Sequence, residues 1–251
     1  MTEPPENANH GWRSLLVIGS VAALVAAIVF RRWLGSEYSL LATMGIFRAG
    51  PKDPPSAVAD WFALLHTNKL VGLALLNAFD LVNYALVGLI FLGLYGALRR
   101  SNKAMMTFAL LLGFLGIGIY FASNQAFPLL ALSDQYAAAS TVQQSAILAT
   151  GQTLLAISDH AVFGTGVFWG FVFVTLSGLI ISIVMLRSGP FGKWTSGIGI
   201  LANALGLGYF FTLALAPSLT FIPLSASAPF LLAWYIMISL KLFRLAKRKI
   251  P

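Results

Sequence analysis

The chain of 251 residues contains no cysteine and few charged side chains. The absence of cysteine excludes a disulfide framework, a thiol nucleophile and a thiolate metal site. Charged residues make up 10% of the chain, whereas a soluble domain carries roughly 25%. So few charges do not cover a water-facing surface, and hydrophobic residues reach 58%. The sequence therefore predicts an integral membrane protein.

Acidic residues are especially scarce, since 8 Asp and Glu stand against 16 Lys and Arg, which gives a net charge of +8. The basic residues lie at the ends of apolar runs and not on a polar domain interleaved with aromatics, so we expect no nucleic-acid partner. The chain has no Walker motif, no HExxH motif and only three histidines, whereas a metal site needs three or four converging ligands. We therefore expect no metal and no cofactor.

Six apolar runs are long enough, or nearly so, to cross a bilayer core of about 30 Å, which takes roughly 20 helical residues. They cover residues 14–30, 70–98, 104–122, 161–186, 194–216 and 227–243. Helices are expected, because a bilayer leaves a short chain no other way to satisfy its backbone. We interpret the first run as a retained anchor, since Arg31 and Arg32 follow it without a small-x-small cleavage site. Ser227 is expected to cap the last helix, with Pro229 in its first turn.

The distribution of basic residues predicts the orientation. They gather in the loops 98–104 and 186–194 and in the C-terminal tail, whereas the loops 123–160 and 217–228 have none. The positive-inside rule places the first group in the cytoplasm. We therefore expect a multi-pass protein of the plasma (cytoplasmic) membrane with both termini cytoplasmic. The segment 31–69 conflicts with this, because it is expected outside and yet holds Lys and Arg. Either it is translocated despite its charge, or the first helix does not cross.

Two connecting segments predict short helices at the membrane interface. Residues 33–47 and 56–66 are apolar but interrupted by charges, which is typical of interfacial helices with Trp33 and Trp61 at headgroup level.

The segment 132–158 predicts an ordered helical cap on the outer face. Ser133 is expected to cap a short alanine-rich helix. Thr141-Val-Gln-Gln144 matches a capping box, so a second helix is expected over about 142–157. The predicted fold class is therefore all-α: a polytopic membrane bundle of about six transmembrane helices with an extracytoplasmic helical cap and interfacial helices. No linker divides the chain, so we expect a single transmembrane domain over 1–251.

Small residues spaced four apart mark the faces where helices are expected to touch in lipid. The pairs are Gly166/Gly170, Ala109/Gly113, Ala202/Gly206 and Ala204/Gly208. Asn203 lies in the same helix as two of these pairs. It is expected to hydrogen-bond across a tight helix contact.

Several motifs carry a family resemblance. They are His66–Lys69, Asp80–Tyr84, Ala122–Gln125, Leu132–Ala139, Met185–Trp194 and Gly199–Asn203. Over roughly residues 60–216 the chain resembles a widespread family of uncharacterised multi-pass prokaryotic membrane proteins, classed as a domain of unknown function. The resemblance implies a helical membrane fold. It implies no activity and no catalytic residues.

Asp80 is an acid inside an apolar run, where an ionised carboxylate costs about 2.5–3.5 kcal/mol at the bilayer centre. Asn77, Asp80 and Tyr84 follow helical spacing, with Asn83 on the flank, so they predict a polar stripe facing the bundle interior. Two interpretations stay open. Asp80 is either paired within the structure, for example with His160, Asn124 or Asn203, or part of a ligand or proton site.

The leading functional hypothesis is an outward-facing cavity that binds a small amphiphile or lipid. The residues expected to line it are Asp80, Asn83, Tyr84, Asn124 and His160. The alternative is an accessory or assembly subunit whose apolar faces dock on another membrane protein, and this alternative predicts a fully paired polar stripe. A second alternative is a membrane-embedded hydrolase, supported only by the presence of Ser, His and Asp near the outer face. Residue types alone do not show that these side chains have the geometry of a catalytic site. We therefore name no catalytic residues.

Overall fold

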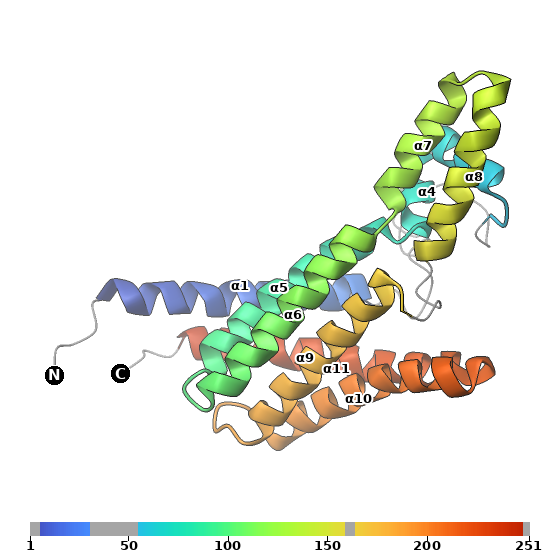
Figure 1. Cartoon of the computed structure of the whole chain (residues 1–251). Coiled ribbons are helices and arrows are strands. Elements are labelled where there is room, and N and C mark those ends of the chain that lie inside the picture. The colour runs from blue at the N-terminus through green and yellow to red at the C-terminus, as the bar shows by residue number, and fades with distance from the viewer. Residues whose placement is uncertain (1–5, 31–54, 159–163, 248–251) are drawn as a thin grey trace. The chain divides into compact units, whose positions relative to one another are not determined.

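The computed structural model describes residues 6–30, 55–158 and 164–247, and every regular element within them is a helix (Figure 1). This confirms the predicted all-α class. The helices are α1 Glu6–Phe30, α3 Val58–Thr67, α4 Lys69–Leu75, α5 Ala78–Leu98, α6 Lys103–Ser123, α7 Ala126–Ala138, α8 Thr141–Ser158, α9 Gly166–Leu186, α10 Lys193–Leu215, the 3-10 turn η2 Pro217–Leu219 and α11 Phe221–Lys247.

Six stretches of the described chain are long and apolar enough to span a bilayer, and each contains or overlaps one of the six predicted runs. They are Gly11–Ile28, Ala78–Leu98, Lys103–Ala138, Gly166–Leu186, Lys193–Leu215 and Pro217–Lys247. The multi-pass membrane architecture is thereby confirmed. Length and hydropathy suffice for this prediction, because a helix that crosses a bilayer must be both long enough and apolar enough to do so.

By packing, the chain forms two compact units. Unit 1 comprises residues 1–31, 83–118 and 170–251, and unit 2 comprises residues 32–82 and 119–169. Three of the four boundaries fall inside α5, α6 and α9, and the fourth lies outside the described residues.

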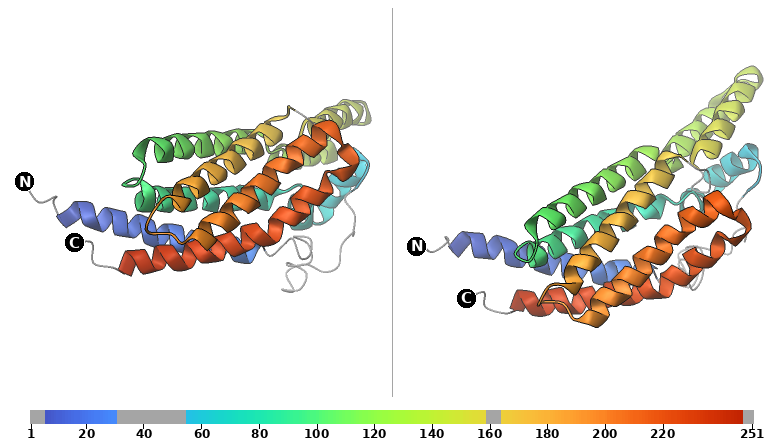
Figure 2. Two further views of the ribbon diagram at one scale, coloured as in Figure 1. Left: turned by 90° about the horizontal axis from the view of Figure 1, so that it is seen from below. Right: turned by 60° about the horizontal axis from the view of Figure 1, so that its bottom comes forward.

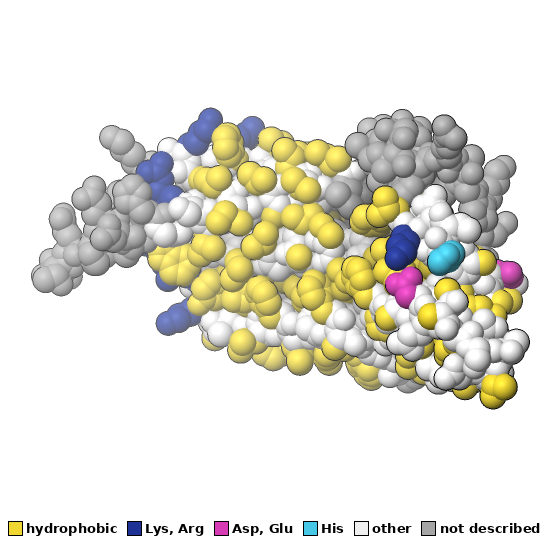
Figure 3. Space-filling model, turned by 90° about the horizontal axis from the view of Figure 1, so that it is seen from above, with side chains coloured by type: hydrophobic (Ala, Val, Ile, Leu, Met, Phe, Trp, Pro, Cys, Tyr) yellow, Lys and Arg dark blue, Asp and Glu magenta, His cyan; other side chains and the backbone are white. Residues whose placement is uncertain are grey.

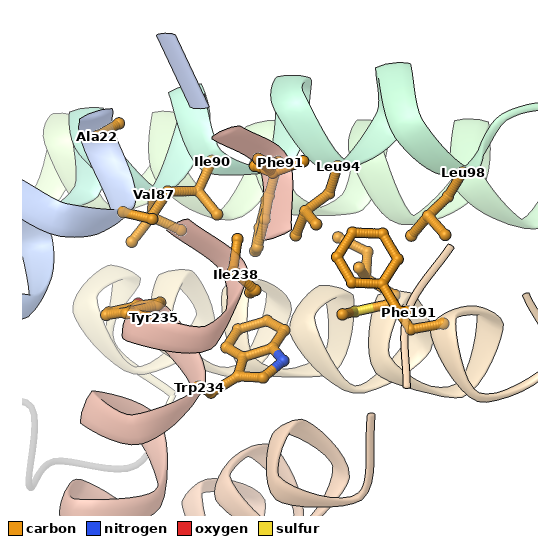
Figure 4. Packing of buried hydrophobic residues seen from close by; sticks show 14 of the residues in the cluster. Ala22, Val87, Ile90, Phe91, Leu94, Leu98, Phe191, Trp234, Tyr235 and Ile238 are labelled. Atoms are coloured by element: carbon orange, nitrogen blue, oxygen red, sulfur yellow. The ribbon is translucent and has the colours of Figure 1, made fainter. Parts of the chain in front are cut away.

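Unit 1 is the bundle of spans. Its core is a cluster of apolar side chains in which one face of α5 packs against α1, α9 and α11. Figure 4 shows Val87, Ile90 and Phe91 of α5 directed toward Tyr235 and Ile238 of α11. Because lipid tails are as apolar as these side chains, close packing and hydrogen bonds hold such helices together, and not the removal of water.

Small residues make the closest helix contacts in unit 1. The Ser177 hydroxyl donates to the carbonyl of Ala109 at 2.7 Å, and a Cβ atom on Gly113 would meet that hydroxyl at 2.8 Å. This places the predicted Ala109/Gly113 pair at the contact of α6 with α9. One close contact lies outside the predicted pairs, because a Cβ atom on Gly93 of α5 would meet the Cα of Gly19 of α1 at 2.9 Å.

The first turns of α1 and the last turn of α11 lie at the same end of unit 1 as the α5–α6 and α9–α10 turns (Figures 1 and 2). Two contacts fix this arrangement. Arg13 Nε donates to the carbonyl of Ala246 at 3.2 Å, and the Arg99 guanidinium lies over the Trp12 ring, 3.4 Å from its centroid. We call this the basic end, because the Lys and Arg side chains of both turns and both terminal helices gather there (Figure 3).

Unit 2 is built on the hairpin of α7 and α8 with α3 and α4 beside it (Figure 1). Its core is formed by Val58, Phe62 and Leu65 of α3 and Leu129 of α7. Gly151 of α8 lies against this core, since a Cβ atom there would meet Val58 at 2.7 Å and Phe62 at 2.9 Å. Helices therefore occupy the predicted cap region, and they extend further toward the N-terminus than predicted.

The predicted helix starts in the cap need correction. Ser133 does not cap a helix: it is buried inside α7, and its hydroxyl donates to the carbonyl of Phe62 at 3.0 Å. The capping residues are one position earlier than predicted, because the Gln143 side chain accepts from the backbone N–H of Ser140 at 3.1 Å and from its hydroxyl at 3.0 Å. The helix itself, α8, begins at Thr141, which agrees with the predicted start near residue 142.

The last span also starts earlier than predicted. α11 begins at Phe221, so Pro229 lies inside the helix and not in its first turn. Ser227 is an interior residue, and its hydroxyl donates to the carbonyl of Leu224 at 2.7 Å. Neighbouring helices in a bundle compensate for the hydrogen bond that a proline removes, which is why proline is tolerated within spans.

The interfacial prediction is corrected for one tryptophan. Trp61 lies on the buried face of α3, with 6% of its surface exposed. The first interfacial segment, 33–47 with Trp33, lies outside the described residues.

Candidate functional site

The candidate site begins with a break in the predicted helix 70–98. The chain forms two helices there, α4 and α5, and Asn77 between them has φ 59°, in the left-handed region. Asparagine is the non-glycine residue that adopts this conformation most readily, because its side chain hydrogen-bonds locally. The continuous helix over 70–98 was therefore a wrong prediction, and Asn77 is not part of a helical stripe.

A second break lies between α6 and α7, and Asn124 joins the two breaks. Its amide Nδ2 donates to the carbonyl of Asn77 at 3.3 Å, and its Oδ1 accepts from the backbone N–H of Ala126 at 3.1 Å. One side chain thus bonds to backbone groups at both breaks, and the Asn77 carbonyl also accepts from the backbone N–H of Asp80 at 3.1 Å. We call the residues at this junction, Asn77, Asp80, Tyr120 and Asn124, the polar clasp; all four belong to unit 2.

Asp80 is held within the polar clasp. The Tyr120 hydroxyl donates to Asp80 Oδ2 at 3.0 Å, and Tyr120 is 5% exposed. Asp80 is the third residue of α5, where the helix N-terminus favours a negative charge. A carboxylate that receives a hydrogen bond and faces a helix N-terminus is far less costly to bury than an unpaired one.

The five predicted site residues are placed as follows. Asp80 and Asn124 meet in the polar clasp. Asn83 and Tyr84 follow on α5 within unit 1, and the amide oxygen of Asn83 is buried without a hydrogen bond from the described chain. His160 lies outside the described residues.

Tyr120 is a residue of the polar clasp that the sequence did not predict. Tyr120 and Asn124 are four residues apart at the end of the apolar run 104–122, a spacing that places two polar groups on one helical face. This pattern was a usable signal, but only the tertiary contact identifies Asp80 as its partner.

Asn203 also differs in part from its prediction. Its amide Nδ2 donates to the carbonyl of Gly199 in its own helix at 2.8 Å. Its Oδ1 lies against Gly178 of α9, where any side chain would collide with it. Asn203 therefore lies at a tight helix contact, as expected, while its donated hydrogen bond stays within α10.

Within the described ranges no three His, Asp or Glu side chains are close enough to share a metal ion. Comparisons of the chain with protein-family models, with curated proteins and with solved structures found no match. The family resemblance accordingly stays a prediction.

Proposed function

We propose that this protein is an accessory or assembly subunit that holds unit 2 as a docking module for another membrane protein. The observation that carries the proposal is the polar clasp, in which Tyr120 bonds to Asp80 and Asn124 bonds to the backbone at two helix breaks. Groups used in this way shape the protein and are not held ready for a ligand. The accessory hypothesis expects paired polar groups: Asp80 and Asn124 meet this expectation, and the amide oxygen of Asn83 does not.

The surface of unit 2 supports a docking role. Large apolar side chains stand exposed on its helices, among them Val142 at 84%, Phe127 at 55% and Ile157 at 50%. Between them lie polar groups, including an ion pair of Lys69 with Asp134 at 3.4 Å whose side chains are 53% and 54% exposed. A mixed surface of this kind is typical of non-obligate protein interfaces.

For its location, we propose the cytoplasmic membrane with the basic end and both termini in the cytoplasm. The support is the gathering of cations at one end of unit 1, which the positive-inside rule assigns to the cytoplasm. In this topology the turn between α7 and α8 belongs outside.

The test measures the size of the complex that the chain forms in native membranes and the polypeptides that this complex contains. The tagged chain, extracted in a mild detergent, is expected to migrate with at least one other polypeptide in fixed proportion. Gly151→Val, which would force Val58 and Phe62 away from α8, is expected to release that polypeptide. Gly118→Ala is the matched control, because nothing lies within 4 Å of a Cβ atom there. A chain that migrates alone in both forms contradicts the proposal.

A second candidate function is the binding of a small amphiphile or lipid, and the buried, unpartnered amide oxygen of Asn83 favours it. A ligand hydroxyl donating to this oxygen would remove the cost of leaving it unsatisfied. Native mass spectrometry of the purified protein tests this. An amphiphile adduct that is present in the wild type and absent in Asn83→Leu supports the candidate, and identical spectra for the two proteins contradict it.

A further inference from the structure

Charge of one sign dominates the basic end. The described part of unit 1 contains a single acidic residue, Glu6 in α1. Against it stand basic residues at both turns and on both terminal helices: Arg13, Arg99, Arg100, Lys103, Arg187, Lys193, Lys241, Arg244 and Lys247. Within the described ranges these cations have no carboxylate partner, so their charge is available to an anion from outside the chain.

Arg99 is held against an aromatic ring. Its guanidinium lies over the Trp12 ring at 3.4 Å from the centroid, a cation–π contact. Trp12 in turn rests on α5, since a Cβ atom on Gly96 would meet the indole at 3.5 Å, and its ring lies 6.5 Å from that of Tyr95. A guanidinium fixed against an aromatic face presents its planar donors in one orientation, which lowers the entropy lost when an anion binds.

The donors of Arg99 are not used by the described chain. No hydrogen bond or ion pair joins its guanidinium to any described residue, and its Nε is buried without a partner. By contrast, Arg13 donates its Nε to the carbonyl of Ala246, and Lys247 lies over the Phe243 ring at 4.4 Å. Arg99, Arg13 and Lys247 are thus each held by a neutral neighbour and have no carboxylate partner among the described residues.

The positions of Arg99 and Trp12 at the ends of their spans indicate which kind of anion would reach them. Arg99 directly follows the last residue of the α5 span, and Trp12 lies in the second turn of α1. Trp, Arg and Lys at the end of a span lie at headgroup depth. Basic sites between spans on the cytoplasmic side bind the phosphates of anionic lipids.

We propose that the basic end binds an anionic phospholipid, with the lipid phosphate on the guanidinium of Arg99 where it stacks on Trp12. The other cations raise the local concentration of anionic headgroups, and Arg99 supplies the paired, planar donors that select a phosphate. This inference concerns a different part of the protein from the polar clasp and does not depend on the docking role of unit 2.

The test is a titration of the purified full chain in neutral detergent with dioleoylphosphatidylglycerol, followed by native mass spectrometry. Dioleoylphosphatidylcholine and inorganic phosphate are the comparison ligands. We expect saturable binding of the anionic lipid, about tenfold tighter than that of the zwitterionic lipid, because charge-assisted hydrogen bonds are roughly twice as strong as neutral ones.

The variant Arg99→Gln is expected to bind the anionic lipid about tenfold more weakly than the wild type for the same reason. The matched control Arg187→Gln removes one charge from the same end and is expected to change the affinity less than about twofold.

Equal losses in Arg99→Gln and Arg187→Gln would show attraction by diffuse charge and would overturn the proposal. Competition by inorganic phosphate at concentrations equal to those of the lipid would also overturn it, since the ligand would then be a soluble anion. If Arg99→Gln does not fold, Arg99→Lys serves instead, because it keeps the charge and loses the planar fork. Affinity reduced in Arg99→Lys at unchanged melting temperature supports the proposal, and unchanged affinity contradicts it.

Discussion

At the scale of single residues, Asp80 is explained by its neighbours. An acid in an apolar run is a functional candidate from sequence alone, because its cost demands a reason. Here the reason is a hydrogen bond from Tyr120 and a position in the first turn of α5. The sequence identified Asp80 and Asn124 as important residues, but it did not show their partners, because the contacts join segments about 40 residues apart along the chain.

Asn77 provides a prediction at this scale. Its φ of 59° is strained for a residue with a Cβ atom unless the side chain compensates. Asn77→Ala is expected to destabilise the protein by about 1 kcal/mol, and Asn77→Gly is expected to be neutral, because glycine adopts this conformation freely. Equilibrium unfolding in detergent measures both. If alanine and glycine destabilise equally, the left-handed conformation at Asn77 is contradicted.

At the scale of helices, the spans were predictable and their breaks were not. Length and hydropathy define a span, so all six predicted runs correspond to helices of the structure. The break at Asn77 is invisible in hydropathy, because Leu75 and Ala78 on either side are apolar. Likewise, Pro229 suggested a helix start by local rules, whereas the α10–α11 packing extends the helix past it. Local sequence propensity therefore predicted the wrong helix boundaries at positions where tertiary contacts determine them.

The contact of Gly19 with Gly93 provides a prediction at this scale. A Cβ atom on Gly93 would lie 2.9 Å from the Cα of Gly19 and 3.2 Å from the carbonyl of Leu15, so the backbones of α1 and α5 would have to separate. Gly93→Ala is expected to cost about 1–3 kcal/mol, as overpacking does. Gly118→Ala, where a Cβ atom meets nothing, is expected to stabilise the protein by up to about 1 kcal/mol in the same unfolding measurement, because alanine favours a helix more than glycine does. Equal stabilities of the two variants would contradict the close approach.

At the scale of the whole molecule, the arrangement of cations predicts the orientation in the membrane. The chain has no native cysteine, so single cysteines report location without background. Ser101→Cys, in the α5–α6 turn, is expected to react with a membrane-impermeant maleimide only after intact cells are opened. Ser140→Cys, in the exposed α7–α8 turn, is expected to react in intact cells. The reverse pattern would invert the proposed topology.

The most direct test of the account is the coupling between Asp80 and Tyr120. A double-mutant cycle with Asp80→Asn, Tyr120→Phe and the double variant isolates their hydrogen bond. Tyr136→Phe is the control, because the Tyr136 ring packs on Phe62 and no hydrogen bond of its hydroxyl to the described chain is found. We predict a coupling free energy of about 0.6–1.7 kcal/mol, the range for side-chain hydrogen bonds between membrane helices. A coupling of zero would contradict the polar clasp and with it the structural role of Asp80.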